Sequence, residues 1–231
     1  MAENPKKGSL GTKNQSMIFH AEVLTAAQKN VLKRLGKFAS QRDFYLAEGT
    51  ALAIYLGHRR SKDFDLFTKG KIADPIRLAG DIKAEGIPFI TGQVEKGTLY
   101  GTISDARVCF LEYLYPLLQP CILWQDFHIP LASLSDLACM KLAAVAQRGS
   151  KKDFVDIFAL GSKIFTLKDM LTLYQKKFSI RDIGHVMFAL TYFDEADGEP
   201  TPKMFLDVDW KTMKKTIRAW VKENQRVALL L

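Results

Sequence analysis

Hydrophobic positions recur along this chain with two periods, which predict two kinds of secondary structure. The apolar residues Val31, Leu35 and Phe38 stand three or four positions apart, which is the spacing of one face of a helix. Thr25 is a residue type that caps helix N-termini well, so a helix is expected to begin there and to end between residues 36 and 40.

The next segments predict a strand that leads into a helix through a glycine turn. Residues 44–47 form a short β-type run, which stops at residues 48–50, and residues 51–56 are typical of a buried helix. Residues 63–67 then alternate acidic and apolar positions, which is the period of a half-buried strand. Both acidic side chains are therefore expected to point to the same side.

Beyond residue 70, a region rich in strands precedes a region made of helices. The first contains a predicted helix and four predicted strands: helix 74–85, and strands 87–90, 98–103, 107–113 and 127–131. The second contains five predicted helices: 134–147, 152–161, 167–177, 181–193 and 210–227. We therefore expect an α/β (α+β) fold, with a mixed sheet and flanking helices in residues 17–132 and a helical part in residues 133–231. Residues 1–16 are polar and without period, which predicts a flexible tail.

Composition narrows the possible functions. The 231 residues include 33 Lys and Arg against 25 Asp and Glu, a net charge of +8, which excludes an acidic solvating chain and favours polyanions as partners. The three cysteines have no CxxC spacing, so neither a zinc site nor a disulfide framework is expected. The absence of a leader and of a run of about 18 apolar residues predicts a cytoplasmic protein without a membrane span.

Asp63 and Asp65 are the first candidates for chemistry. Two positions apart on a strand, their carboxylates share a face, where one divalent ion such as Mg²⁺ or Mn²⁺ would relieve their repulsion. Taken alone, the pair is more commonly a solvent-facing acid pair. Gly49 and Thr50 strengthen the hypothesis, because they open a helix whose free N–H groups and dipole suit a phosphate. An ordinary strand-to-helix turn is the alternative, and together the two features favour a nucleotide site.

Several segments resemble the signature of the AbiEii/AbiGii-type nucleotidyltransferases. The first block comprises YLAEGTALA (residues 45–53), LGHRRS (56–61) and DFDLF (63–67). The second comprises SLSDLACMKL (133–142) and RGSKKDFVD (148–156), similar to the lysine helix and the following basic-acidic motif of that family. The resemblance extends over roughly residues 22–165 and implies a fold of the polymerase-β-like nucleotidyltransferase superfamily, to which that family belongs.

The resemblance implies a role for residues of both blocks. Gly49 and Thr50 would hold the triphosphate of an NTP, and Asp63 and Asp65 would hold Mg²⁺. Lys141 would meet a phosphate of the nucleotide.

The resemblance also implies that Asp156 or Asp153, with a slight preference for Asp156, would orient or deprotonate the acceptor. From spacing alone, Lys141 would be a lysine that reaches solvent from an apolar helix. Asp153 and Asp156 would then be surface acids paired with Lys151 or Lys152.

Four residues just before the acid pair are further candidates. His58, Arg59 and Arg60 are close enough in sequence to reach a nucleotide phosphate, although a solvated loop is an equal alternative. Ser61 is either a hydroxyl ligand or a turn residue. The isolated His20, His128 and His185 are expected to be structural.

Two positions depart from the family pattern. Glu48 stands where the turn commonly has another glycine, and its charge would repel a triphosphate. A third metal-binding carboxylate is expected on strand 107–113, which offers only Glu112 near its end, with Cys109 in the place where an acid would serve. The sequence therefore gives less support for a two-metal mechanism than for the binding of one ion.

The combined hypothesis is a Mg²⁺-dependent enzyme that moves an NMP group from an NTP to a hydroxyl of RNA, such as tRNA, or of protein. The resemblance implies the toxin of a toxin–antitoxin or phage-defence pair, with an antitoxin as partner. Two alternatives remain open: a non-catalytic nucleotide- or RNA-binding protein, and a small-molecule adenylyltransferase. The last helix combines basic residues with Trp210 and Trp220, which fits an RNA groove or, more commonly, an amphipathic helix with its tryptophans inward.

Overall fold

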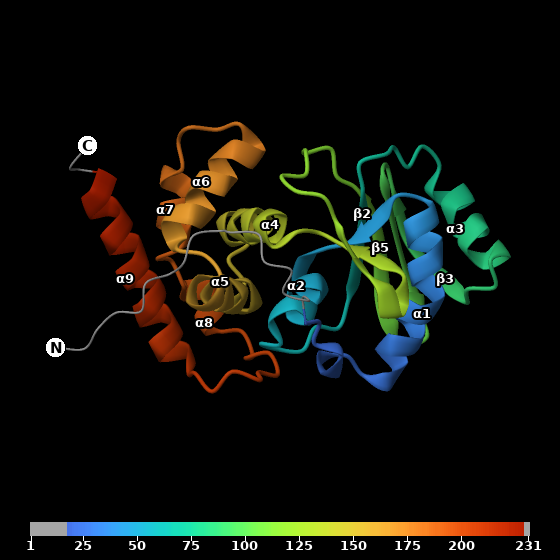
Figure 1. Ribbon diagram of the computed structural model, residues 1–231, viewed down its shortest axis with the longest axis horizontal. Helices are drawn as coiled ribbons and strands as arrows, with labels where there is room; N and C mark the ends of the chain where they lie inside the picture. The colour runs from blue at the N-terminus through green and yellow to red at the C-terminus, as the bar shows by residue number, and fades with distance from the viewer. Residues whose placement is uncertain (1–17, 229–231) are drawn as a thin grey trace.

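The computed structural model describes residues 18–228, whose centre is a seven-stranded mixed sheet (Figure 1). The strands lie in the order β3-β4-β5-β2-β1-β7-β6. In chain order they are β1 (Phe44–Leu46), β2 (Phe64–Thr68), β3 (Phe89–Glu95), β4 (Thr98–Ile103), β5 (Ala106–Glu112), β6 (Ile122–Trp124) and β7 (Ile129–Leu131). Strand β2 pairs parallel with β5 and antiparallel with β1, which places Asp65 in the middle of the sheet and Asp63 directly before β2.

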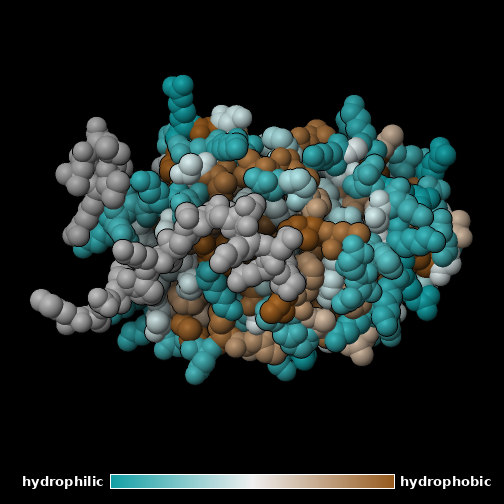
Figure 2. All heavy atoms as spheres, viewed as in Figure 1, coloured by the Kyte–Doolittle hydropathy of each residue, from teal (hydrophilic) through white to brown (hydrophobic). Residues whose placement is uncertain are grey.

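Helices pack on both sides of this sheet and leave one face of β3, β4 and β5 exposed. They are α1 (Ala26–Gln41), α2 (Glu48–Leu56), α3 (Pro75–Ala84), α4 (Leu134–Gln147), α5 (Lys151–Lys163), α6 (Leu167–Phe178), α7 (Gly184–Ala189), α8 (Asp194–Asp197) and α9 (Trp210–Ala228), with 3₁₀ turns at Ala21–Val23 and Gln125–Phe127. Helices α1 and α3 pack on one side of the sheet, and α2 lies between the sheet and the C-terminal helices (Figure 1). The outer surfaces of α1 and α3 are mainly hydrophilic, and hydrophobic residues gather near the middle of the same view (Figure 2).

Local sequence explains where the main helices begin. Thr25 and Gln28 form a capping box at the start of α1, and the Ser133 hydroxyl accepts from the Asp136 N–H at the start of α4. Asp74 caps α3, with a proline at its first position. The predicted helices at these places are confirmed, α4 with the predicted bounds.

The last helix packs as an amphipathic element. Met213, Ile217 and Val221 on α9 are buried, and the Trp220 ring stacks on Phe158 with centroids 6.0 Å apart. A Cβ at Gly161 would lie 2.4 Å from the Trp220 ring, so the glycine permits this approach. This packing is the inward-facing alternative predicted for Trp220.

Other predicted elements need correction. The predicted helix 181–193 is wrong as one element, because α7 ends at Ala189 and α8 follows separately. The helix does not continue past this point, because the Thr191 N–H and hydroxyl both donate to the Phe188 carbonyl and form a tight turn there. Strand β6 was not predicted, since three residues show no period, and predicted strand 127–131 begins only at Ile129.

The remaining expectations concern length and boundaries. Strand β3 continues past residue 90, where the predicted strand ended. The sequence did not indicate this extension, because β3 is an edge strand whose side chains are mostly exposed and therefore show no clear alternation of polar and apolar residues. The proposed tail, residues 1–16, lies outside the described residues. None of the described helices combines the length and the apolar character needed to cross a bilayer.

Candidate active site

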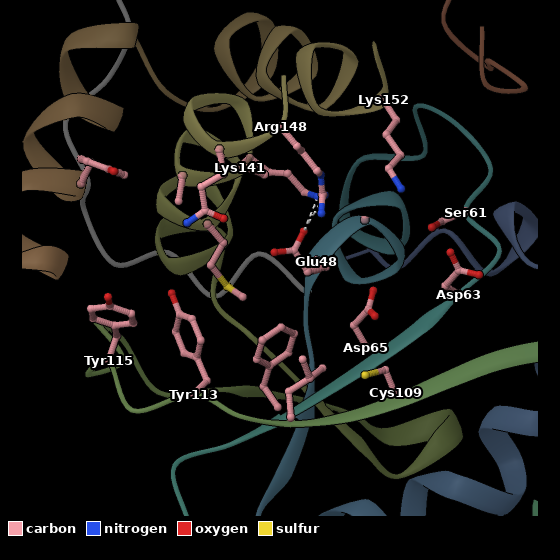
Figure 3. A pocket seen from close by; sticks show the side chains of 18 of the residues that line it. Glu48, Ser61, Asp63, Asp65, Cys109, Tyr113, Tyr115, Lys141, Arg148 and Lys152 are labelled. Atoms are coloured by element: carbon pink, nitrogen blue, oxygen red, sulfur yellow. Dashed lines mark hydrogen bonds and ion pairs between the residues drawn. The ribbon is translucent and has the colours of Figure 1, made fainter. Parts of the chain in front are cut away.

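A cavity of about 720 Å³ lies between the sheet and the C-terminal helices. One end of the cavity is lined by side chains of both charges. Asp63 and Asp65, on the side of the sheet, face Lys152 at the start of α5 (Figure 3). The other end is aromatic, with Tyr113 and Tyr115 beyond the end of β5. The charged end of the cavity therefore suits a charged part of a ligand, and the aromatic end suits a flat ring of the same ligand.

The two predicted metal ligands lie on the cavity wall as expected. Asp65 is partly buried in β2, and burial, together with the charges of Glu48 and Asp63, raises its pKa to about 6. Asp63 is more exposed and accepts from Arg107, whose Nε lies 2.9 Å from Oδ1. A cation near Asp65 would relieve the repulsion that raises its pKa.

The start of α2 forms only part of the predicted phosphate cradle. Gly49 lines the cavity, and a Cβ there would lie 2.6 Å from Nη2 of Arg59, so a larger residue would push this guanidinium away from Asp156. The N-cap, Ala47, has no side chain that could bond the first N–H groups of α2. Thr50, in contrast, is fully buried, and its hydroxyl donates to the Asp63 carbonyl. Thr50 therefore positions the strand that carries the acids.

Glu48 takes part in the site in a way the sequence analysis did not foresee. Its φ of 54° lies in the left-handed region that favours glycine, which gives a physical reason for the glycine common at this position in the family pattern. Its carboxylate accepts from Lys141, with Oε2 2.5 Å from Nζ. Glu48 is thus the counter-ion of the lysine that was expected to meet a phosphate.

Lys141 lies at the floor of the cavity inside a buried network of charges. Besides Glu48, its Nζ lies 3.3 Å from a carboxylate oxygen of Asp153 and 3.3 Å from one of Asp156. Burial would lower the pKa of Lys141, but these three carboxylates raise it above its ordinary value. Lys141 is therefore a permanent cation, and the alternative of a lysine that reaches solvent does not apply.

Asp156 and Asp153 lie behind the cavity and hold its cations. Asp156 is fully buried and accepts from Arg59 through Nε at 2.7 Å and Nη2 at 2.8 Å, and from Nε2 of His58 at 2.7 Å. Burial opposes its ionisation, but Arg59 and Lys141 hold its pKa below the ordinary range. Neither aspartate lines the cavity. This placement suits the support of Arg59 and Lys141, while the predicted contact with an acceptor stays a prediction.

The two arginines that precede the acid pair lie in different places. Arg59 lines the cavity with its guanidinium held by Asp156, and Ser61 lines it beside Gly49. Arg60 is absent from the cavity lining, and its backbone N–H donates to the Lys203 carbonyl at 2.8 Å. His58 is likewise absent from the lining and is buried against Asp156, so the structure brings Arg59 and Ser61, but not His58 or Arg60, to the predicted site.

Several lining residues were missed by sequence reasoning. Lys152 reaches the acid end from α5, where its charge opposes in small part the rise in the pKa of Asp65 that burial causes (Figure 3). His185, expected to be structural, lines the cavity at the aromatic end, where Tyr174 also lies. The only usable signal was the alternation of Tyr113 and Tyr115 directly after a strand, which puts both on one side.

The donors available for a metal ion are few. Among residues 18–228, no group of three or more His, Cys, Asp or Glu side chains is arranged to hold one. Cys109 lies opposite Asp65 in the register of β2 and β5, as the sequence suggested, and Glu112 instead accepts from the Ile72 N–H. Asp63 and Asp65 are therefore the residues that could hold a divalent cation, and their oxygens suit one hard ion such as Mg²⁺ or Mn²⁺.

Comparisons with known proteins give the family and the fold of the chain. A family model described as "Nucleotidyl transferase AbiEii toxin, Type IV TA system" matches residues 112–223, which include Lys141 and Asp156 but not the acid pair. An uncharacterized protein of Aquifex aeolicus (strain VF5) is 36% identical over 205 residues, 87% of this chain and 97% of that protein.

Two solved structures share the fold at low identity. MenT4, a nucleotidyltransferase toxin from Mycobacterium tuberculosis H37Rv, is 14% identical with a TM-score of 0.57, and the match covers 84% of this chain and 81% of that one. JHP933 from Helicobacter pylori is 16% identical with a TM-score of 0.55, covering 91% and 97%. The chain has the nucleotidyltransferase fold and belongs to the AbiEii family.

Proposed function

We propose that this protein transfers an NMP group from an NTP to a hydroxyl group of RNA or protein, with release of pyrophosphate. The observation that carries the proposal is the cavity in which Asp63 and Asp65 face Gly49 at the start of α2 and the cations Lys141 and Lys152. Carboxylates for a cation and N–H groups and cations for phosphates meet there.

The donor would lie along the cavity. Its triphosphate would lie at the start of α2, between Lys152 and Arg148, whose guanidinium is bound to Asp153 but half exposed. Its base would lie among Tyr113 and Tyr115 at the aromatic end, where flat rings can stack. Lys141, whose charge is balanced by Glu48, Asp153 and Asp156, would hold Glu48 and hence the start of α2 in position.

Asp63 and Asp65 would hold a divalent cation, Mg²⁺ or Mn²⁺. When bound, the ion supplies positive charge beside the phosphoryl group that is transferred. To coordinate it through both oxygens, Asp63 would give up at least part of its contact with Arg107. The two carboxylates support one ion rather than two.

Membership of the AbiEii family supports a toxin with an antitoxin partner. The fold likeness to MenT4, described as a nucleotidyltransferase toxin, is consistent with this. The arrest of growth on expression, and its relief by a product of a neighbouring gene, is the corresponding cellular test.

The direct test is transfer of label from each α-³²P-labelled NTP, with Mg²⁺, to total RNA or to protein. We expect label in the wild type and none in Asp65→Asn, with full labelling retained in Asp126→Asn, which changes an exposed acid in the turn before β7. Equal labelling by wild type and Asp65→Asn would contradict the proposal.

A non-catalytic nucleotide-binding protein is the second candidate, and Cys109 in place of a third acid is the observation that favours it. Calorimetric binding of an NTP without label transfer to RNA, protein or a panel of hydroxylated small molecules would establish it. Transfer to a small molecule alone would instead identify a small-molecule adenylyltransferase.

A further inference from the structure

The aromatic end of the cavity is built on a stretch of chain that is neither helix nor strand. Residues 113–121 connect β5 to β6, and Tyr113 and Tyr115 project from them into the cavity (Figure 3). We call residues 113–121 the tyrosine segment. The Tyr115 side chain is half exposed, and its neighbour Leu114 is 70% exposed. Because no helix or sheet ladder fixes the course of this segment, other groups must hold its backbone.

A buried ion pair between two helices holds the tyrosine segment from behind. Lys177, in the last turn of α6, and Asp136, in the first turn of α4, have fully buried side chains, with Nζ 2.6 Å from Oδ1. Lys177 also donates to the Pro116 carbonyl at 2.8 Å. Asp136 accepts from the N–H groups of Leu118, at 2.9 Å, and Gln119, at 3.3 Å. The ion pair thus binds three backbone groups of the segment.

The same turn of α6 contacts both tyrosine rings. Nζ of Lys177 lies 5.2 Å from the centroid of the Tyr113 ring, which is within the range of a cation–π contact. Phe178 meets the Tyr115 ring edge to face, with centroids 4.8 Å apart. Lys177 does not line the cavity, so it reaches Tyr113 from behind and leaves the cavity side of the ring open. The end of α6 therefore sets the position of both rings.

Stability alone is a poor explanation for this buried ion pair. Taking two charges out of water is costly, and well-packed apolar residues of similar volume are often as stabilising or more so. Apolar side chains could not, however, bind the Pro116 carbonyl or the Leu118 N–H. What Asp136 and Lys177 add to the fold is a fixed course for the backbone that carries the two tyrosines.

We propose that Asp136 and Lys177 are positioning residues for the nucleobase of the NTP. They act through the tyrosine segment, which they hold so that the base stacks on the rings of Tyr113 and Tyr115. This inference rests on the proposed function, in which the base lies at the aromatic end of the cavity. The triphosphate lies at the opposite, charged end, so the ion pair affects the binding of the base and not that of the phosphates.

The test separates base from phosphates by comparing two kinds of ligand. Calorimetry with Mg²⁺ measures the affinity for each NTP and for tripolyphosphate, which has the phosphates without sugar or base. Lys177→Met should weaken binding of the preferred NTP about fivefold or more, because stacking is lost, and should leave the affinity for tripolyphosphate unchanged. Lys176→Met, at the exposed neighbouring lysine of α6, should change neither affinity.

Two further variants avoid a buried charge without a counter-ion, which could prevent Lys177→Met from folding. The double variant Asp136→Asn with Lys177→Met removes both charges, while the asparagine oxygen can still accept from Leu118. Tyr115→Ala removes one half-exposed ring and leaves the ion pair intact. Both should lose affinity for the NTP and keep the affinity for tripolyphosphate.

Other results overturn this inference or the proposed function separately. Equal weakening of NTP and tripolyphosphate in the double variant would show that the ion pair supports the cavity as a whole, and an unchanged NTP affinity would show that it supports neither ligand. A selective loss in Tyr115→Ala that is absent from the double variant would place the base at the rings but exclude Asp136 and Lys177 as its positioning residues. Failure of the wild type to bind any NTP would instead contradict the proposed function itself.

Discussion

Cys109 lies directly opposite Asp65 in the parallel pairing of β2 and β5, and its thiol lines the same cavity as the Asp65 carboxylate. Burial raises the pKa of this thiol to about 12, so Cys109 is a neutral group beside the Asp65 carboxylate, whose ionised form is disfavoured. The register places a third acid within reach of the first two if one were present at position 109.

The variant Cys109→Asp should therefore bind Mg²⁺ or Mn²⁺ more tightly than the wild type does. Its free energy of unfolding should also depend on the concentration of the ion. Three carboxylates repel one another without a cation, so the variant should unfold more easily in EDTA than the wild type. With the ion in excess, binding to the folded state alone should recover that loss. Calorimetric titration with Mn²⁺ and urea unfolding with and without Mg²⁺ measure the two effects. Cys109→Asn, similar in size but uncharged, should show neither.

The backbone of Glu48 gives a second prediction, which separates strain from charge. At φ 54° a residue with a Cβ is disfavoured, so Glu48→Gly should be more stable than Glu48→Ala by about 1 kcal/mol. Both variants lose the ion pair with Lys141, which cancels in the comparison. Urea unfolding at pH 7 measures the difference, and equal stabilities would show that the turn relaxes.

How far the sequence predicts this fold depends on whether the determining signal is local. The capping residue Thr25 and the alternation around Asp65 are local, and they predicted the first helix and the central strand. The opposition of Cys109 and Asp65 follows from a pairing 44 positions apart, and only the family resemblance suggested it.

The candidate site shows the same division. Gly49, Asp63 and Asp65 are neighbours in sequence and were predicted. The aromatic end needs Tyr113 and Tyr174, and Lys152 reaches the acid end only because of the way α5 packs on α2. Spacing along one element cannot give contacts of that kind, just as it made Lys141 look like a lysine exposed to solvent.

The raised pKa of Asp65 predicts a pH-dependent cost to stability. Its folded-state pKa of about 6 exceeds the ordinary 3.8, so between these values the folded chain binds the extra proton and stability falls as pH rises. Asp65→Asn should gain stability relative to wild type by up to about 3 kcal/mol above pH 6, and by much less below pH 4. Urea unfolding of both proteins at pH 4 and pH 7.5, in EDTA, measures this difference, and a gain that does not depend on pH would contradict it.

The contact of Asp156 with Arg59 predicts the opposite dependence. The folded-state pKa of Asp156 is lowered, so its stabilisation is present above the unfolded-state value of about 4 and is lost as pH falls toward the folded-state value. Asp156→Asn leaves the buried guanidinium without its counter-ion and should cost about 3–5 kcal/mol at pH 7. The loss should shrink in acid. Asp126→Asn, at an exposed position, should change stability by less than about 0.5 kcal/mol.

Lys152 offers the sharpest separation of binding from folding, because it is exposed and yet lines the cavity beside the acid pair. Lys152→Ala should weaken NTP binding by about five- to tenfold, since one phosphate contact is lost, and should leave the unfolding free energy within about 0.5 kcal/mol. Lys37→Ala, at an exposed lysine of α1, should change neither quantity. Calorimetry at low and high salt adds a further criterion, because screening should reduce the difference between Lys152→Ala and wild type. Equal NTP affinities of wild type and Lys152→Ala at low salt would place the triphosphate elsewhere in the cavity.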